Sequence, residues 1–284
     1  MKVALILRGV FLLLVQNSYA INLSLISSNL CSWGENTSQR ISKIGDKIQN
    51  EFLSQTYAQS PRIVLLQEVI QKNGISTADD LAKKLNMKYL YKKAHQNEGI
   101  GILFNQELSI SNENSLDIKS KAHEGDYSRA AQAIQIHLPD EAGKSKTLRI
   151  INTHLAHEPT YENTRKKQIA EIINWLHKLE EESQSDFIIL GGDFNTGLSE
   201  NYYADEFDVL FNSRFFFELP LLASQQATWF DEVNSKAEKV DYFFNSGLNS
   251  KNILSKEHVL DLHSEKLSDH DALALSISPI KESY

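Results

Sequence analysis

The chain has 284 residues, of which 41% are hydrophobic and 23% charged, and 37 acidic residues outnumber 29 basic ones for a formal net charge of −8. This composition, with 12 glycines and 5 prolines, excludes a disordered, collagen-like or low-complexity chain, and the single cysteine, Cys31, excludes an intrachain disulfide framework and a multi-cysteine zinc site. The acidic charge argues against an electrostatically driven nucleic-acid binder, although not against a catalytic encounter with phosphate.

The first twenty residues have the layout of a secretory signal peptide. Lys2 precedes an apolar region that Arg8 interrupts, and Ser18 and Ala20 are the small residues expected before a cleavage site. We expect cleavage after Ala20 and a secreted or periplasmic protein. Cleavage removes two basic residues and no acidic one, so the exported chain would be more acidic still. A short buried strand or an uncleaved anchor is the alternative.

From residue 21 onward, short apolar runs alternate with segments of helical periodicity. The clearest helix carries Ile169, Ile172, Leu176 and Leu179 on one face. Predicted helices span 38–57, 77–86 and 161–182; predicted strands span 21–27, 63–66, 89–91, 99–104, 129–138, 148–153, 187–190, 242–245, 253–259 and 272–278. Because helices and strands are interspersed without a linker, residues 21–284 are predicted to form one α/β domain.

Polar side chains gather where several of these strands are predicted to end. Carboxylates and carboxamides are hard oxygen ligands, which suit magnesium or calcium better than zinc. The strongest single signal is segment 191–195 (GGDFN), because it puts two oxygen ligands directly after an apolar strand. The gathered residues are Asn29, Glu68, Asn152, Thr153, His154, Asp193, Asn195, Asp241, Asp269 and His270.

Each of these residues also has an ordinary structural interpretation. Asn29 suits a turn, Glu68 a solvated position beyond a strand, and His154 a hydrogen-bonded structural histidine. The glycines of segment 191–195 could form a simple turn, and Ser268 could cap a helix, although an apolar strand-like run follows it. The whole set, in this chain order, is more specific than any one member.

Six short motifs lie along the chain in the following order: Asn29, Gln67-Glu68, Thr153-His154-Leu155, Gly192-Asp193-Phe194-Asn195, Asp241-Tyr242 and Ser268-Asp269-His270. In this order they resemble the endonuclease/exonuclease/phosphatase superfamily, typified by DNase I and bacterial sphingomyelinase. The resemblance implies a four-layer α/β sandwich, in which two mixed β-sheets lie face to face with helices outside. It also implies cleavage of a phosphoester by a water molecule that a divalent metal ion activates.

The same resemblance implies a metal site and a phosphate site. Glu68 would bind the metal ion, with Asn29 nearby and Asp269 in support. The expected ion is Mg²⁺, with Mn²⁺ or Ca²⁺ as alternatives. Arg129 lies where many relatives place a phosphate-binding arginine. Such groups are needed because a phosphodiester repels anionic nucleophiles until its oxygens are neutralised.

The resemblance also implies the catalytic roles. His154 would hydrogen-bond the scissile phosphate, while Asp193 and Asn195 would orient the attacking water and a phosphate oxygen. Asp241 would hold His270 in the correct tautomer, so that His270 acts as general base or acid. A histidine paired with a carboxylate titrates near neutral pH and can therefore move a proton.

One candidate substrate is a phospholipid headgroup, as in the bacterial sphingomyelinases. Segments 29–34, 153–155 and 227–229 look like those enzymes. Two features differ. The sphingomyelinases carry an exposed aromatic hairpin before the Ser-Asp-His motif, whereas segment 253–267 has no Phe, Trp or Tyr, and Gln67 stands where they commonly have asparagine.

The second candidate is a DNase I-like endonuclease acting on nucleic acid. Gln67 and segment 128–130 suit nucleases equally well, and the basic residues at 92–93 and 165–167 could line a cleft or simply form a solvated face. The net negative charge disfavours backbone binding. A third candidate is a non-catalytic effector or binding module that keeps the fold. The presence of all the expected carboxylates and of both histidines argues against it. No stable protein partner is implied, and we expect a monomer.

Overall fold

The computed structural model describes residues 22–32, 37–55, 60–72, 74–121, 123, 126–139, 145–157, 159–197, 205–213, 215, 226–231, 233–248 and 258–278. The predicted signal segment, residues 1–20, lies outside the described residues. None of the helices within these ranges is both long enough and apolar enough to cross a membrane.

A seven-stranded mixed sheet contains the first and the last strands of the chain. The strand order is β13-β14-β1-β2-β5-β4, with β3 paired to β2. β1 and β2 are parallel, whereas the other neighbours are antiparallel. The strands are β1 (Leu23–Asn29), β2 (Arg62–Lys72), β3 (Ile75–Ser76), β4 (Met87–His95), β5 (Glu98–Asn105), β13 (His258–Leu260) and β14 (Ala272–Ile277).

A five-stranded mixed sheet is built from the middle of the chain, in the order β12-β9-β8-β7-β6. β8 and β9 are parallel, and the remaining pairs are antiparallel. The strands are β6 (Ile110–Ile118), β7 (Arg129–Pro139), β8 (Ser145–His154), β9 (Phe187–Asp193) and β12 (Asp241–Ser246). A separate hairpin consists of β10 (Trp229–Asp231) and β11 (Lys236–Glu238).

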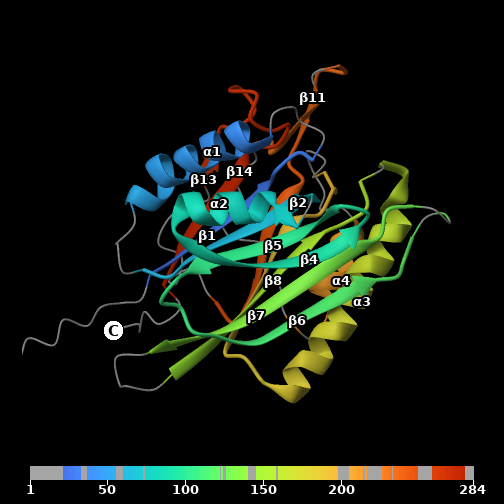
Figure 1. Cartoon of the computed structure of the whole chain (residues 1–284). Coiled ribbons are helices and arrows are strands. Elements are labelled where there is room, and N and C mark those ends of the chain that lie inside the picture. Colours follow the sequence, from blue (N-terminus) through green and yellow to red (C-terminus); the bar gives the residue numbers. More distant parts are fainter. Residues whose placement is uncertain are drawn as a thin grey trace, which may run out of the picture.

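Helices cover the outer face of each sheet (Figure 1). α1 (Thr37–Lys47) and α2 (Thr77–Leu85) pack on the seven-stranded sheet, and α3 (Glu162–Glu182) and α4 (Asp208–Phe211) pack on the five-stranded sheet. α1 continues into a π-helical turn (Ile48–Phe52) and a 3₁₀ turn (Leu53–Gln55), and further 3₁₀ turns span Pro159–Tyr161 and Asp205–Phe207.

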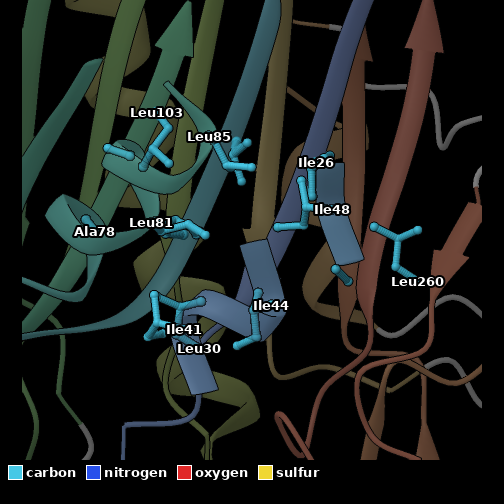
Figure 2. Close-up of a cluster of buried hydrophobic side chains, with 14 of the residues drawn as sticks. Ile26, Leu30, Ile41, Ile44, Ile48, Ala78, Leu81, Leu85, Leu103 and Leu260 are labelled. Carbon is cyan, nitrogen blue, oxygen red and sulfur yellow. The ribbon is translucent and has the colours of Figure 1, made fainter. Parts of the chain in front are cut away.

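Three hydrophobic clusters separate the four layers. Successive side chains of a strand point to opposite faces, so neighbours in sequence enter different clusters. In β1, Leu25 packs between the two sheets and Ile26 packs under α1 and α2, as Figure 2 shows for Ile26. In β8, Ile150 packs between the sheets and Ile151 packs under α3. This arrangement confirms the predicted sandwich of two mixed sheets with helices outside.

The structure corrects some of the predicted element boundaries. The strand predicted over 63–66 runs on to Lys72, so Glu68 lies within β2 and not beyond its end. The helix predicted over 38–57 loses its α-helical form after Lys47. β6 was not predicted, because it is an edge strand whose central residues are exposed and polar. Of the predicted strand 253–259, only residues 258 and 259 are described, and they belong to β13.

A buried ion pair joins the five-stranded sheet to the helix α3 that covers it. The side chain of Arg149 in β8 is fully buried, and its Nε donates to Glu180 Oε1 of α3 at 2.5 Å. The guanidinium also donates to the carbonyl oxygens of Leu179 and Ser183, which caps the last turn of the helix. Glu180 is thus the carboxylate that compensates a cation with no solvent around it.

We therefore expect Glu180→Ala to lower the free energy of unfolding by about 3–5 kcal/mol, since it leaves the charge of Arg149 buried and uncompensated. Urea denaturation of the variant and the wild type measures this loss. Glu180→Gln, which keeps a hydrogen-bond acceptor at the same place, should lose less. A loss below about 1 kcal/mol for the alanine variant would contradict the role given to the pair.

Candidate functional site

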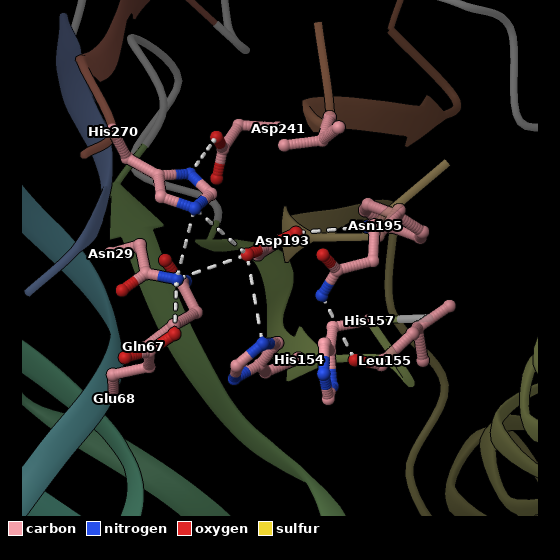
Figure 3. Close-up of polar contacts among 12 residues, drawn as sticks. Asn29, Gln67, Glu68, His154, Leu155, His157, Asp193, Asn195, Asp241 and His270 are labelled. Carbon is pink, nitrogen blue, oxygen red and sulfur yellow. Dashed lines mark hydrogen bonds and ion pairs between the residues drawn. The ribbon is translucent and has the colours of Figure 1, made fainter. Parts of the chain in front are cut away.

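The predicted site residues converge at one edge of both sheets (Figure 3). Asn29, His154 and Asp193 are the last residues of β1, β8 and β9. Asp241 is the first residue of β12, which runs antiparallel to β9, so the two aspartates face each other across the ladder. His154 is the register partner of Asp193 in the parallel pair β8–β9. Arg129 begins β7 at the same edge.

Glu68 reaches this edge through an irregularity in β2. The pairing of β2 with β5 shifts register between Leu66 and Val69, and Glu68 has a φ of 53°, which non-glycine residues rarely adopt. Asn195, directly after β9, has a φ of 51°. Such backbone conformations cost about 1–3 kcal/mol each and persist where neighbouring contacts impose them.

The carboxylate of Glu68 is held as an anion. Oε2 accepts a hydrogen bond from the Ser32 backbone N–H at 2.7 Å, and Oε1 accepts one from Asn29 Nδ2 at 3.0 Å. Burial favours the neutral acid, but these two donors and the positive charge of His270 outweigh it and lower the pKa of Glu68.

Asn29 connects the acidic residues of the two sheets. Its Nδ2 lies 3.0 Å from Glu68 Oε1, 3.0 Å from Asp193 Oδ2 and 3.4 Å from His270 Nε2, and its Oδ1 accepts from the Cys31 N–H at 2.9 Å. The side chain is thereby fixed by contacts on both its oxygen and its nitrogen.

His270 lies between two buried carboxylates. Its Nδ1 is 3.0 Å from Asp241 Oδ2, and its Nε2 is 3.7 Å from Asp193 Oδ2. Burial disfavours the imidazolium, yet the charges of Asp241 and Asp193 raise the pKa of His270 above its ordinary value. Burial and the neighbouring Asp241 raise the pKa of Asp193. The 3.0 Å distance between Asp241 Oδ2 and His270 Nδ1 is the contact through which Asp241 would hold the histidine.

His154 and Arg129 form the opposite wall. His154 Nε2 lies 3.6 Å from Asp193 Oδ2, and Arg129 Nη1 lies 3.1 Å from each ring nitrogen of His154. Burial, followed by the positive charge of Arg129, lowers the pKa of His154 well below its ordinary value, so the imidazole is neutral.

Arg129 is a buried cation without a counter-ion in the described part of the chain. Only 7% of the residue is exposed, its Nε has no hydrogen-bond partner, and no described carboxylate lies within 4.0 Å of the guanidinium. Nη2 contacts His157 Nδ1 at 3.3 Å. A buried guanidinium in this state is suited to bind an oxyanion.

Two predicted residues lie at the margins of this network. Asn195 donates its backbone N–H to Asp193 Oδ1 at 2.8 Å and its Nδ2 to the Leu155 carbonyl oxygen at 3.0 Å. The Asp269 carboxylate lies near Cys31. Burial of the thiol, followed by the negative charge of Asp269, raises the pKa of Cys31 to about 12. Its Oδ1 is buried without a hydrogen-bond partner.

The donor set fits a hard divalent cation. Asp193, Asp241 and His270 each offer one ligand atom within 4.8 Å of the others, and Asp241 Oδ1 is buried without a hydrogen-bond partner. Glu68 adds a third carboxylate, which Asn29 links to Asp193. Carboxylate oxygens of this kind are typical ligands of Mg²⁺, Mn²⁺ or Ca²⁺. The cluster of Asp193, Asp241 and His270 is therefore a candidate metal site.

Some residues that the sequence analysis named without a catalytic or binding role support the site. Ser268 Oγ donates to the Asn29 carbonyl oxygen at 2.9 Å and accepts from the His270 N–H at 3.1 Å. Gln67 Nε2 donates to Asn152 Oδ1 at 2.8 Å between the sheets. His157, which lies three residues after His154, also contacts Arg129. A second histidine so close to the His154 motif was the sequence signal that could have drawn attention to it.

We expect inorganic phosphate or sulfate to stabilise the protein through Arg129. At 100 times its dissociation constant, an anion that binds only the folded state adds about 2.7 kcal/mol. Arg129→Met should unfold at a higher temperature than the wild type in anion-free buffer, because it removes an uncompensated buried charge, and phosphate should not stabilise it further. Thermal unfolding with and without phosphate measures both effects; an equal response of the two proteins would contradict the assignment.

No protein-family model matches the sequence, and the search of curated proteins finds no match. Solved structures do match. Truncated Caenorhabditis elegans TDP2 has a TM-score of 0.65 at 15% identity, over 93% of this chain and all of that one. The human Nocturnin catalytic domain with bound sulfate has a TM-score of 0.62 at 16% identity, over 90% and 94%. An endonuclease/exonuclease/phosphatase family protein from Leptotrichia buccalis has a TM-score of 0.64 at 18% identity, over 90% and 99%. The chain therefore has the fold of the endonuclease/exonuclease/phosphatase superfamily, as its motifs predict.

Proposed function

We propose that the protein is a divalent-metal-dependent phosphodiester hydrolase. The observation that carries this proposal is the single buried network that joins Glu68, Asn29, Asp193, Asp241 and His270, with the unpaired guanidinium of Arg129 beside it. The carboxylates at one end of the site are suited to bind a metal cation, and the Arg129 guanidinium at the other end is suited to bind a phosphate anion. The sulfate bound to Nocturnin, a protein of the same fold, is an anion of similar shape and charge to phosphate.

The chain's own residues account for substrate binding and proton movement. Arg129 would neutralise a non-bridging phosphate oxygen, and the neutral imidazole of His154 would donate a hydrogen bond to another. Asp193, together with Asn195, would orient the attacking water.

The remaining groups would handle the proton and the charge. His270 would transfer a proton at Nε2, while Asp241 on Nδ1 holds the tautomer and stabilises the imidazolium. A divalent ion bound at the site would supply further charge neutralisation and a more acidic water. Glu68, Asn29 and Asp269 are the ligands expected from the motifs.

The purified chain from residue 21 onward should hydrolyse bis-p-nitrophenyl phosphate with Mg²⁺, and EDTA should abolish the reaction. His270→Ala should lower kcat by about 10²–10⁴-fold, the usual contribution of a general acid or base. His137→Ala, an exposed histidine at the far end of β7, is the matched control and should retain activity. Unchanged turnover in His270→Ala, or turnover that survives EDTA, would overturn the proposal.

For the substrate we favour a phospholipid headgroup over nucleic acid. The observation is Val233, which is 91% exposed in the turn of the β10–β11 hairpin. Phe230 of the same hairpin donates its N–H to the Asp269 carbonyl oxygen, and Val233 lines the same pocket as Trp229 and Asp269. An apolar tip beside the site suits a substrate that lies in a membrane, whereas the negative net charge disfavours a polynucleotide.

Parallel assays on sphingomyelin vesicles, plasmid DNA and RNA, each with Mg²⁺, test this choice. We expect hydrolysis of the lipid to exceed that of either nucleic acid. Val233→Asp should weaken activity on vesicles but leave bis-p-nitrophenyl phosphate turnover unchanged. Activity confined to plasmid or RNA would remove the lipid proposal and establish the nuclease instead.

From the predicted signal segment, we propose that the protein is secreted or periplasmic. We also propose that it acts as a monomer. Sequencing the amino terminus of the exported protein tests the cleavage site after Ala20.

A further inference from the structure

The Asp241–His270 hydrogen bond joins two different sheets. Asp241 begins β12 of the five-stranded sheet, whereas His270 lies just before β14 of the seven-stranded sheet. No backbone ladder of either sheet sets the 3.0 Å distance between Asp241 Oδ2 and His270 Nδ1. The distance therefore depends on whatever holds the two strand ends together.

A short segment, Thr228 to Phe230, binds the backbone on both sides of His270. Phe230 N–H donates to the Asp269 carbonyl oxygen at 3.0 Å, and Asp271 N–H donates to the Thr228 carbonyl oxygen at 2.8 Å. Trp229 and His270 are thus partners in an isolated antiparallel bridge.

The same segment binds the start of β12. The fully buried hydroxyl oxygen of Thr228 accepts the backbone N–H groups of Val240 and Asp241, each at 3.1 Å. Phe194 N–H donates to the Val240 carbonyl oxygen at 2.9 Å, one residue beyond the paired ends of β9 and β12. The Asp241 N–H, one residue further on, points away from β9, and Thr228 Oγ1 is its acceptor.

We propose that Thr228 is a positioning residue that sets the Asp241–His270 geometry. Its hydroxyl oxygen holds the backbone of Asp241, and its carbonyl oxygen holds the backbone that carries His270. One residue thereby spans the gap between the sheets at the point where the two side chains meet. The kinetic part of this inference rests on the proposed phosphodiesterase function.

The test compares Thr228→Val with Thr228→Ser. Valine keeps the shape but removes the acceptor, so we expect kcat to fall by about 10–100-fold with KM within about two-fold, as for a small misplacement of catalytic groups. Serine keeps the hydroxyl and should restore kcat to within about three-fold. By NMR with ¹⁵N-labelled histidine, the downfield Nδ1–H resonance of His270 should shift upfield in the valine variant only.

Thr147→Val is the matched control. Thr147 Oγ1 accepts the Asp186 N–H at 3.0 Å near the start of β8, at the opposite end of the strand from His154. The same chemical change there should leave both kcat and the His270 resonance unchanged. A folded Thr228→Val protein with wild-type kcat and an unshifted resonance would overturn the proposal.

The role of Thr228 can also be decided in two cases where the kinetic comparison is not possible. If the wild type hydrolyses no phosphodiester, the proposed function fails, and the histidine resonance alone decides the role of Thr228. If Thr228→Val does not fold, native-state hydrogen exchange of the wild type decides it. The Asp241 amide should then exchange at least about 100-fold more slowly than the exposed turn amide of Asn234, and equal rates would overturn the proposal.

Discussion

The site depends on one amide group placed between like charges. Asn29 Nδ2 lies 3.0 Å from Glu68, which belongs to the seven-stranded sheet, and 3.0 Å from Asp193, which belongs to the five-stranded sheet. The buried carboxylate of Asp193 and the partly buried carboxylate of Glu68 would repel each other between the sheets, and a donor between them reduces that repulsion. The edge of the sandwich can therefore collect negative charge without forcing the two sheets apart.

The charges of the site are separated by position. The acidic residues Glu68, Asp193 and Asp241 lie on one side of His154, and Arg129, which no described carboxylate contacts within 4.0 Å, lies on the other. Burying these groups costs stability, because Asp193 and Asp241 share the single imidazolium of His270 and no described carboxylate pairs directly with Arg129. Under the proposed function, binding of a divalent cation and of a phosphate would recover this lost stability. A net charge of −8 for the chain is consequently compatible with a local preference for phosphate.

Local patterns predicted the interspersed helices and strands and the polar residues near the strand ends, whereas the layers of the fold were implied by the resemblance of the motifs to a known superfamily. Apolar runs and the GGDFN turn are visible within a few residues, and the motif order identifies the architecture. The sequence could not show the π-helical turn after α1, the polar edge strand β6, or Glu68 within a strand. It also did not indicate the part played by Thr228, whose partners Asp241 and Asp271 are set by the meeting of two sheets. Such contacts depend on tertiary packing, which a local sequence pattern does not reveal.

The irregularity at Glu68 also determines how the rest of β2 is packed. In a regular strand, Leu66 and Val69 would point to opposite faces, since they are an odd number of residues apart. Both instead belong to the cluster under α1 and α2. The extra residue thus turns Glu68 toward the site and reverses the alternation of the strand after it. Deleting Glu68 would leave Leu66 and Val69 two residues apart, so a regular strand would keep both side chains in the core and only the acidic side chain would be lost. Core packing alone therefore does not require the extra residue, and its consequence is that an acidic side chain faces the site from a strand whose apolar residues stay in the core.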